Sequence, residues 1–276
     1  IYSTPTHTPP TLLYYPMPSP SSSSTRTRRR TDHPTLQRIA PHPTPHLTLY
    51  EIPHFLTDEE CDRLRSIPVN QFARGRTVDA GTDDAQAVHF GRTSTTVTLP
   101  TDQQAAFHQM VAKRLPNIWR ANDHEPTQLA RYTEGQHYDY HHDFFEEAAL
   151  KSTNPASPQR QRTWTLLVYL DDGGPDGALP TNPVSQTRRR STSPRSRTRT
   201  QTRHTRRPHE YGGATHFGHP DTNITVYPER GKAILWNNLL PSGKPNTKTL
   251  HSGKPLGKGC EKRIVTQWFL EKGGTK

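Results

Sequence analysis

The sequence has few of the residues that cross-link a protein or hold it in a membrane. Its 276 residues include only two cysteines, Cys61 and Cys260, so one disulfide is the most it can form, and the redox compartment stays open. No stretch of about 18 consecutive apolar residues occurs, so no membrane-spanning segment is expected. Apolar residues make up 29% of the chain and the mean hydropathy is −0.95, which is polar for a folded protein of this length. Part of the chain is therefore expected to lie outside the folded domain.

The excess of positive charge is confined to two segments. Residues 1–46 carry five arginines against Asp32, and residues 173–210 carry nine arginines against Asp176 and Glu210. Their net charges of +4 and +7 account for the whole formal charge of +11, so the rest of the chain is neutral in sum. Both segments hold too few apolar side chains to offset the entropy of ordering, which predicts disorder. Arginine runs can bind nucleic acid through its phosphates, but a solvated run without a dedicated partner is the favoured interpretation.

The start of the chain carries no evident targeting signal. The stretch "TLLYYPM" is too short and too interrupted by proline to predict a signal peptide. The first residue is Ile1 rather than methionine, which suggests a missing N-terminal segment, so an upstream signal stays open.

A folded domain is expected over residues 47–276, interrupted by the basic segment. An alternating apolar stretch there runs into a predicted helix, for which Thr57 and Glu60 have the spacing of a capping box. Cys61, Leu64 and Ile67 supply the apolar stripe of this helix.

A second helix is predicted over residues 102–115, followed by a change to a period of two. Thr101 and Gln104 have the same boxed spacing, and the apolar face consists of Phe107, Met110, Val111 and Leu115. Five later stretches are rich in Val, Ile, Thr and aromatics and predict strands: 126–132, 162–170, 223–228, 232–238 and 263–270. Helices followed by a run of strands indicate a mainly β fold with supporting helices, an antiparallel sandwich of the jelly-roll or double-stranded β-helix kind.

The pattern His-x-Asp occurs three times, as His137/Asp139, His141/Asp143 and His219/Asp221. On a strand, residues i and i+2 point to the same face, so an imidazole and a carboxylate can converge on one metal ion. Two histidines and one carboxylate form the typical site of non-haem Fe(II) oxygenases, and the third ligand must come from elsewhere in the chain. With 16 histidines present, the pattern alone does not select one pair.

The neighbouring residues select His141 and Asp143. The series Tyr132-x-x-Gly-Gln-x-Tyr138-x-x-His141-x-Asp143 resembles the metal-site strand of prolyl 4-hydroxylases, members of the 2-oxoglutarate and Fe(II)-dependent dioxygenases. On this resemblance His137 falls at a variable position, and His142 points to the opposite face. The stretch "GHPDTN", which holds the third pair, reads as a turn.

The resemblance continues in order along residues 47–172 and 211–274. It is carried by "FLTDEEC", "GRTSTTVTLP", "EPTQLARY", "RTWTLLVYL", "GGATHF", "VYPERGKAILWNN" and "LHSGKPLGKGCEKRIVTQW". It implies a third iron ligand, His251. It also implies that Lys262 binds the distal carboxylate of 2-oxoglutarate, to which Tyr132 and Thr215 donate hydrogen bonds.

Three further residues fall at informative positions. The resemblance assigns Tyr138 and Arg162 to contacts with a peptide substrate, against the alternatives of sheet packing and a charge at a strand edge. Trp268 either lines the pocket or fills the core, and the core is the favoured interpretation.

Two departures from the family pattern stand out. One additional residue precedes Lys262, which predicts a bulge or a longer turn there. The larger departure is the basic segment 173–210, which interrupts the pattern after Asp172 and resembles a translated intron as much as an evolved loop. A surface insertion adds closure entropy only as the logarithm of its length, so the fold can accommodate it.

The resemblance implies an enzyme that uses Fe(II), 2-oxoglutarate and O2 to convert peptidyl proline to 4-hydroxyproline, releasing succinate and CO2. It also implies ascorbate as a cofactor, a proline-rich protein substrate and a location in the endoplasmic reticulum or secretory pathway. Two alternatives stay open. The acceptor of the same chemistry could be another group such as peptidyl lysine, or the chain could be an inactive, nucleic-acid-associated protein.

Overall fold

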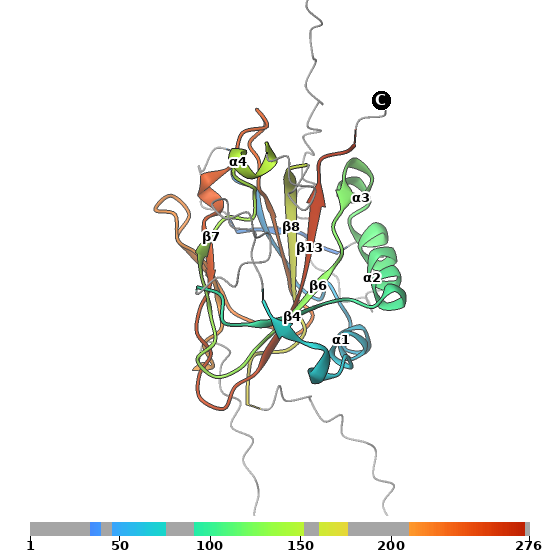
Figure 1. Cartoon of the computed structure of the whole chain (residues 1–276), viewed down its shortest axis with the longest axis vertical. Coiled ribbons are helices and arrows are strands. Elements are labelled where there is room, and N and C mark those ends of the chain that lie inside the picture. The colour runs from blue at the N-terminus through green and yellow to red at the C-terminus, as the bar shows by residue number, and fades with distance from the viewer. Residues whose placement is uncertain (1–33, 40–45, 76–90, 152–159, 176–209, 274–276) are drawn as a thin grey trace, which may run out of the picture.

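A computed structural model describes residues 34–39, 46–75, 91–151, 160–175 and 210–273 (Figure 1). Most of the two segments predicted to be disordered lies outside the described residues, so that expectation stays a prediction. Gln37–Arg38 is an exception, because it forms a short strand, β1, within the first of these segments.

Two antiparallel sheets make up most of the described chain. The larger sheet has nine strands, and β5 (Asp123–His124) joins it through β13. Its other strands run in the order β1, β2 (Leu49–Ile52), β11 (Ala233–Asn237), β8 (Arg162–Tyr169), β13 (Lys262–Leu270), β6 (Gln128–Tyr132), β4 (Thr95–Thr98), β3 (Ala73–Arg74). The smaller sheet runs in the order β10 (Ile224–Val226), β9 (Thr215–Phe217), β12 (His251–Gly253), β7 (Tyr138–His141).

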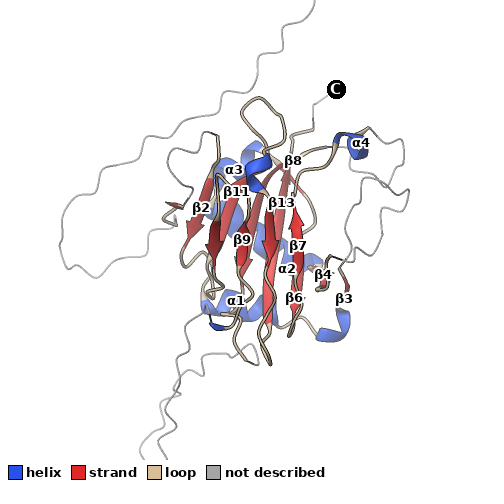
Figure 2. Cartoon of the chain, turned by 90° about the vertical axis from the view of Figure 1, so that its left-hand side faces the viewer, coloured by secondary structure: helices blue, strands red, loops and turns tan. Residues whose placement is uncertain are grey.

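The helices lie on one side of the large sheet and the small sheet lies on the other (Figures 1 and 2). The helix layer consists of α1 (Asp58–Arg65), α2 (Thr101–Arg114) and α3 (Pro116–Ala121), and the short α4 (Glu147–Leu150) lies at one end of the strands. Two 3-10 turns, Val69–Gln71 and Thr247–Thr249, complete the described helical elements. None of the described helices has the length and apolarity needed to cross a membrane. Two facing antiparallel sheets with a helix layer confirm the predicted mainly β, jelly-roll class, and all five predicted strands are present.

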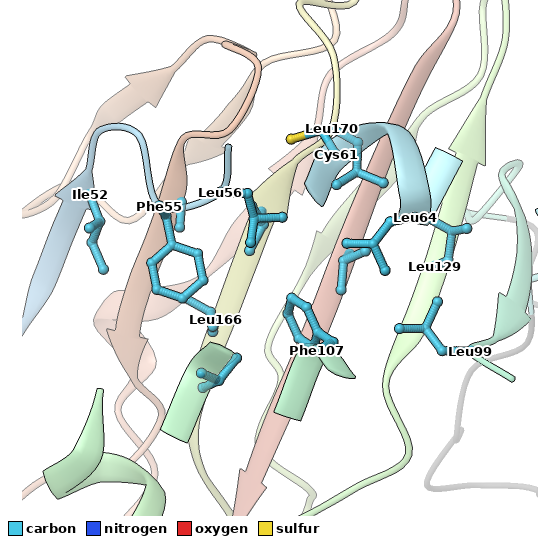
Figure 3. Packing of buried hydrophobic residues seen from close by; sticks show 14 of the residues in the cluster. Ile52, Phe55, Leu56, Cys61, Leu64, Leu99, Phe107, Leu129, Leu166 and Leu170 are labelled. Carbon is cyan, nitrogen blue, oxygen red and sulfur yellow. The ribbon is translucent and has the colours of Figure 1, made fainter. Parts of the chain in front are cut away.

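Successive side chains of the large sheet point to opposite faces, so its apolar residues form two separate hydrophobic clusters. One cluster lies between the helices and the sheet and includes Leu64, Phe107, Leu129 and Leu166 (Figure 3). The other, which includes Trp236, lies between the two sheets. Because the second cluster fills the space between the sheets, it positions the facing strands that carry the site described below.

The two predicted capping boxes have different outcomes. At α1 the box is confirmed: Thr57 Oγ1 accepts from Glu60 N–H at 3.2 Å, and Glu60 Oε2 accepts from Thr57 N–H at 2.8 Å. At α2 the prediction is wrong. The helix begins one residue earlier, with Pro100 as its N-cap, and no side chain caps it. The Gln104 side chain instead accepts from the backbone N–H of Thr127 at 3.0 Å, so it ties the helix to the chain entering β6.

Phe107 provides a test of the cluster beneath the helices. Its side chain is fully buried, so Phe107→Ala should lower the free energy of unfolding by about 3–5 kcal/mol through lost burial and a residual cavity. Denaturant unfolding followed by circular dichroism measures the change. Val69 is 48% exposed, and Val69→Ala should change stability by less than about 0.5 kcal/mol. Equal effects of the two substitutions would contradict this description of the core.

The described residues on either side of the basic insertion lie next to one another. Gly174 packs against the Tyr211 ring, and both neighbouring stretches form isolated bridges to the connection between β12 and β13, Pro175 with Cys260 and Gly212 with Leu256. The insertion therefore begins and ends at one place on the fold.

Candidate metal centre

Three potential metal ligands converge between the two sheets. His141 ends β7, Asp143 follows two residues later in the loop, and His251 begins β12 directly opposite His141 in the sheet register. One ligand atom from each lies within 4.8 Å of the others, and no other such group of three occurs in the described ranges. The two histidines are 110 positions apart in the sequence and meet because β7 and β12 are adjacent antiparallel strands.

Hydrogen bonds to the main chain fix the orientation of both imidazoles. His141 Nδ1 lies 2.7 Å from Asp139 O, and His251 Nδ1 lies 2.9 Å from Thr249 O. A carbonyl oxygen can only accept, so each Nδ1 carries the proton and each Nε2 keeps its lone pair for a metal. The two Nε2 atoms each lie 3.8 Å from a different carboxylate oxygen of Asp143.

The protonation states of the group suit a cation. Burial, together with the neighbouring His251, lowers the pKa of His141 to about 3, so this imidazole is neutral at physiological pH. Burial opposes ionisation of Asp143, but His251, His141, Arg162 and the Thr165 hydroxyl outweigh it and hold the pKa of this carboxyl below its ordinary value. The site therefore offers two imidazole nitrogens, one of them from a neutral His141, and one carboxylate.

The remaining histidines of the motif region point elsewhere. His137 Nδ1 contacts Gly135 O, and its Nε2 lies 3.6 Å from Asp139, outside the converging group. His142 Nε2 contacts Thr247 O, and its ring stacks on Phe144. The pair His219/Asp221 lies in a turn in which the Asp221 N–H donates to His219 Nδ1, as the sequence predicts.

Lys262 lies on the interior face of β13 with its side chain almost completely buried. Its Nζ donates to Gly213 O at 2.5 Å and lies 4.5 Å from the centre of the Tyr132 ring. Burial lowers the pKa of Lys262 to about 8, and the charge of Asp171 opposes this shift. Burial in turn raises the pKa of Asp171 to about 6, against the effect of Arg65. A buried ammonium group of this kind is suited to an anionic ligand.

Tyr132 and Thr215, the two residues expected to assist Lys262, are both buried. Tyr132 lies on β6, and the cation–π contact places its ring beside the ammonium group. Thr215 lies on β9, where its Oγ1 accepts a hydrogen bond of 2.7 Å from the Tyr169 hydroxyl. Sequence reasoning missed Tyr169, although its even spacing from Thr165 and Leu167 along one strand places all three on the same face.

Tyr138 and Arg162 each contact one of the converging ligands. The Tyr138 ring stacks on the His141 ring with their centres 3.6 Å apart, and the Arg92 guanidinium lies 4.9 Å from the centre of the Tyr138 ring. Arg162 NH1 donates to Asp143 O at 3.3 Å, and two further nitrogens bind Glu125 at 2.6 and 2.7 Å. Tyr138 also packs against the cluster between the sheets, and Arg162 reaches the backbone carbonyl of Asp143, so the assignment of both to a peptide substrate stays a prediction.

Trp268 is not part of the buried core, and the favoured expectation for it was wrong. It is half-buried, belongs to neither hydrophobic cluster, and lies 3.9 Å beneath the Arg162 guanidinium. Its alternation with Lys262 along β13 places both side chains on the interior face. The additional residue before Lys262 is accommodated by a turn, in which Cys260 N–H donates to Gly257 O and Gly259 has a positive φ of 68°.

Comparison with known proteins identifies the family to which this chain belongs. Residues 127–270, just over half of the chain, match the family model described as "2OG-Fe(II) oxygenase superfamily". The chain belongs to this superfamily. The matched range contains the three converging ligands and Lys262.

Relatives and a solved structure agree with this membership. The chain is 26% identical over 235 residues to prolyl 4-hydroxylase subunit alpha-2 of Gallus gallus, covering 83% of this chain and 35% of that protein. It is 27% identical over 216 residues to prolyl 4-hydroxylase 2 of Arabidopsis thaliana, covering 78% and 64%. It thus spans about a third of the chicken protein and less than two thirds of the plant protein. A viral collagen prolyl hydroxylase from Paramecium bursaria Chlorella virus 1, solved as its 2OG complex, has the same fold, with a TM-score of 0.50, 23% identity and coverage of 82% and 96%.

The superfamily implies Fe(II) and 2-oxoglutarate, and the residues fit both. Two imidazoles and a carboxylate are the donor set that suits non-haem Fe(II) and leaves further coordination positions open. Hydrogen bonds from each Nδ1 to a backbone carbonyl orient both rings, and the low pKa of His141 leaves its Nε2 ready without prior deprotonation. Lys262 offers a buried cation for the carboxylate of a co-substrate.

Proposed function

We propose that this chain hydroxylates peptidyl proline at C4, consuming 2-oxoglutarate and O2 and releasing succinate and CO2. The observation that carries the proposal is the convergence of His141, Asp143 and His251, together with the buried Lys262, within a superfamily oxygenase fold. The relatives named prolyl 4-hydroxylase support proline as the acceptor over lysine. Balanced over the whole reaction, one oxygen atom enters the substrate C–H bond and the other enters succinate.

The positions of the residues support the following roles. His141, Asp143 and His251 would hold Fe(II), and Lys262, Tyr132 and Thr215 would hold the distal carboxylate of 2-oxoglutarate. When bound, Fe(II) supplies the redox chemistry that couples decarboxylation of 2-oxoglutarate to oxygenation by O2.

Tyr138 and Arg162 would position the peptide. Tyr138 covers His141, and Arg162 is held beside Asp143 by Glu125 and by the ring of Trp268. Burial raises the pKa of the Tyr138 hydroxyl, so it stays protonated and can donate a hydrogen bond to a peptide carbonyl. Because Arg162 is fixed by a bidentate ion pair, little side-chain entropy remains to be lost on binding.

The test is an assay of succinate formation with Fe(II), 2-oxoglutarate, ascorbate and a panel of proline-rich peptides. Mass spectrometry of the products should show one added oxygen on proline, and fragmentation should place it at that residue. Oxidation of lysine rather than proline would show that lysine is the acceptor. A protein that binds Fe(II) and 2-oxoglutarate but oxidises no peptide would overturn the proposal.

The affinity for 2-oxoglutarate should depend on pH through Lys262. Below its pKa of about 8 the free lysine is already charged, so binding needs no proton. Above that pKa the dicarboxylate must draw in a proton, and the Kd should rise about tenfold per pH unit. Calorimetry from pH 6.5 to 9.5, in buffers with different ionisation enthalpies, measures both affinity and proton uptake. A Kd that is constant across this range would show that Lys262 is not the anchor.

Ascorbate as the reductant and a secretory compartment belong to the same proposal and rest on the family resemblance. Omitting ascorbate from the assay should shorten the period of linear turnover. Retention of full, linear turnover without any reductant would remove ascorbate from the proposal.

A further inference from the structure

A chain of two hydrogen bonds ends on the carboxylate of the candidate metal site. Asn238 Nδ2 donates to Thr165 Oγ1 at 2.9 Å, and the Thr165 hydroxyl donates to Asp143 Oδ2 at 2.8 Å. Asn238 follows β11, Thr165 lies in β8, and both side chains are fully buried. Asn238 itself contacts none of the three candidate ligands in the hydrogen bonds and ion pairs of the described residues.

The direction of this relay is determined by chemistry. A carboxyl group that ligates a metal is deprotonated, so the oxygens of Asp143 can only accept. Thr165 has one proton, which it must therefore give to Asp143, and its oxygen needs a donor from the other side. Only the amide nitrogen of Asn238 can supply that donor, since the amide oxygen would face a hydroxyl whose proton is already committed.

The relay makes the two oxygens of Asp143 unequal. Oδ2 receives the Thr165 proton, whereas Oδ1, which lies 3.8 Å from His141 Nε2, receives no hydrogen bond from another described residue. Oδ1 is therefore the more available oxygen for a metal. Coordination through one oxygen keeps positions open for a co-substrate and O2, whereas coordination through both would occupy one of them.

The position of Asn238 is held by its backbone, and its side chain is costly. Its N–H donates to Thr163 O at 2.8 Å, and its C=O accepts from Asn246 N–H at 2.9 Å, so the residue is fixed between β8 and the loop before the 3-10 turn Thr247–Thr249. Its Oδ1 is buried and has no hydrogen-bond partner among the described residues. A buried, unpaired carbonyl lowers stability, which argues that the amide serves the site rather than the fold.

We propose that Asn238 is a positioning residue for the metal centre: acting through Thr165, it orients Asp143 so that one carboxylate oxygen faces the ion. The proposal deepens the function proposed above and rests on it. Outer hydrogen-bond partners of metal ligands commonly contribute 10- to 100-fold to metal affinity.

The test measures metal binding directly, with Co(II) as a spectroscopic probe and Fe(II) under anaerobic conditions. Thr165→Val has nearly the same shape and removes the hydroxyl, so it should weaken the affinity for both metals about 10- to 100-fold and change the Co(II) absorption spectrum. Thr165→Ser keeps the hydroxyl and should restore most of the affinity. Asn238→Leu should weaken binding about 3- to 10-fold, because the hydroxyl remains but is no longer oriented.

The decisive measurement is the double variant. If Asn238 acts only through Thr165, Asn238→Leu should cause no further loss of metal affinity in the Thr165→Val background, within about twofold. Losses that multiply would overturn the relay, as would wild-type affinity in both single variants. Asn238→Met, with a more adaptable side chain, replaces the leucine variant if circular dichroism shows that the latter does not fold.

A matched control separates this role from general loss of stability. Asn237 is also buried and makes three side-chain hydrogen bonds, to Thr48, His46 and Leu239, none of which leads to the site. Asn237→Leu should lower stability and leave metal affinity unchanged, and a comparable loss of metal affinity would overturn the proposal. A wild-type chain that binds neither Co(II) nor Fe(II) would instead refute the proposed function, so the two failures are distinct.

Discussion

Replacing His141 with alanine should abolish turnover, lowering kcat/KM by more than about a thousandfold, equivalent to at least about 4 kcal/mol of transition-state stabilisation. The expectation follows from its place in the group of three: Nε2 faces Asp143 and His251, and Nδ1 is committed to a backbone carbonyl. Two remaining ligands would bind Fe(II) weakly and without a fixed geometry. Elemental analysis of the purified variant, together with the succinate assay, measures both losses.

The matched control is His137→Ala. His137 belongs to the same sequence pattern four residues earlier, yet its side chain contacts Gly135 and Asp139 rather than the converging group. This variant should keep most of the metal and most of the turnover. The opposite result, with activity lost on replacing His137 and kept on replacing His141, would show that the wrong pair was assigned.

Replacing Lys262 with methionine should weaken the binding of 2-oxoglutarate but stabilise the free protein. The affinity for 2-oxoglutarate should fall about 30- to 5,000-fold, because removing one partner of a buried charge pair costs about 2–5 kcal/mol. The free protein, however, should become more stable at pH 7. Burial lowers the pKa of Lys262 from 10.5 to about 8, which corresponds to an unfavourable contribution of about 3 kcal/mol at most. Methionine has a similar length and carries no charge.

The pH dependence of stability tests independently whether the buried Lys262 lowers the free energy of unfolding. Between pH 8 and 10.5 the unfolded wild-type chain binds a proton that the folded chain has released, so wild-type stability should rise with pH through that window. Lys262→Met should lack this rise. Lys258 is exposed, and Lys258→Met should alter neither stability nor co-substrate affinity. A methionine variant that binds 2-oxoglutarate normally would remove Lys262 from the site.

Local sequence rules predicted those features that local interactions determine. The capping box at Thr57 and Glu60 forms as expected, because both hydrogen bonds lie within one turn of helix. The same spacing at Thr101 and Gln104 gives no box, since Pro100 takes the cap position and Gln104 binds Thr127 across a tertiary contact. A tertiary hydrogen bond of this kind leaves no trace in a four-residue pattern.

In the candidate site, too, the sequence predicted some residues, whereas others could be found only in the structure. His141 and Asp143 could be selected because their neighbours match a family pattern, and the structure brings His251 to them from a distant strand. Thr165 and Asn238 could not be found in this way. A threonine inside a strand and an asparagine just after another strand both have ordinary structural uses. Their relevance depends on β8 and β11 being neighbours in the large sheet and on the loop after β7, which carries Asp143, lying against β8. Trp268 was misjudged because partial burial beneath an arginine cannot be distinguished from core packing by residue type.

The contact between Gly174 and Tyr211 has a practical consequence for engineering. Since the residues on the two sides of the basic insertion are already in contact, the fold does not require a connecting segment of any particular length between them. A short glycine link could replace residues 176–209, and a fluorescent or affinity domain could be carried there instead, at a closure cost that grows only logarithmically. The connection between β8 and β9 is therefore a position at which this fold can accept additional chain.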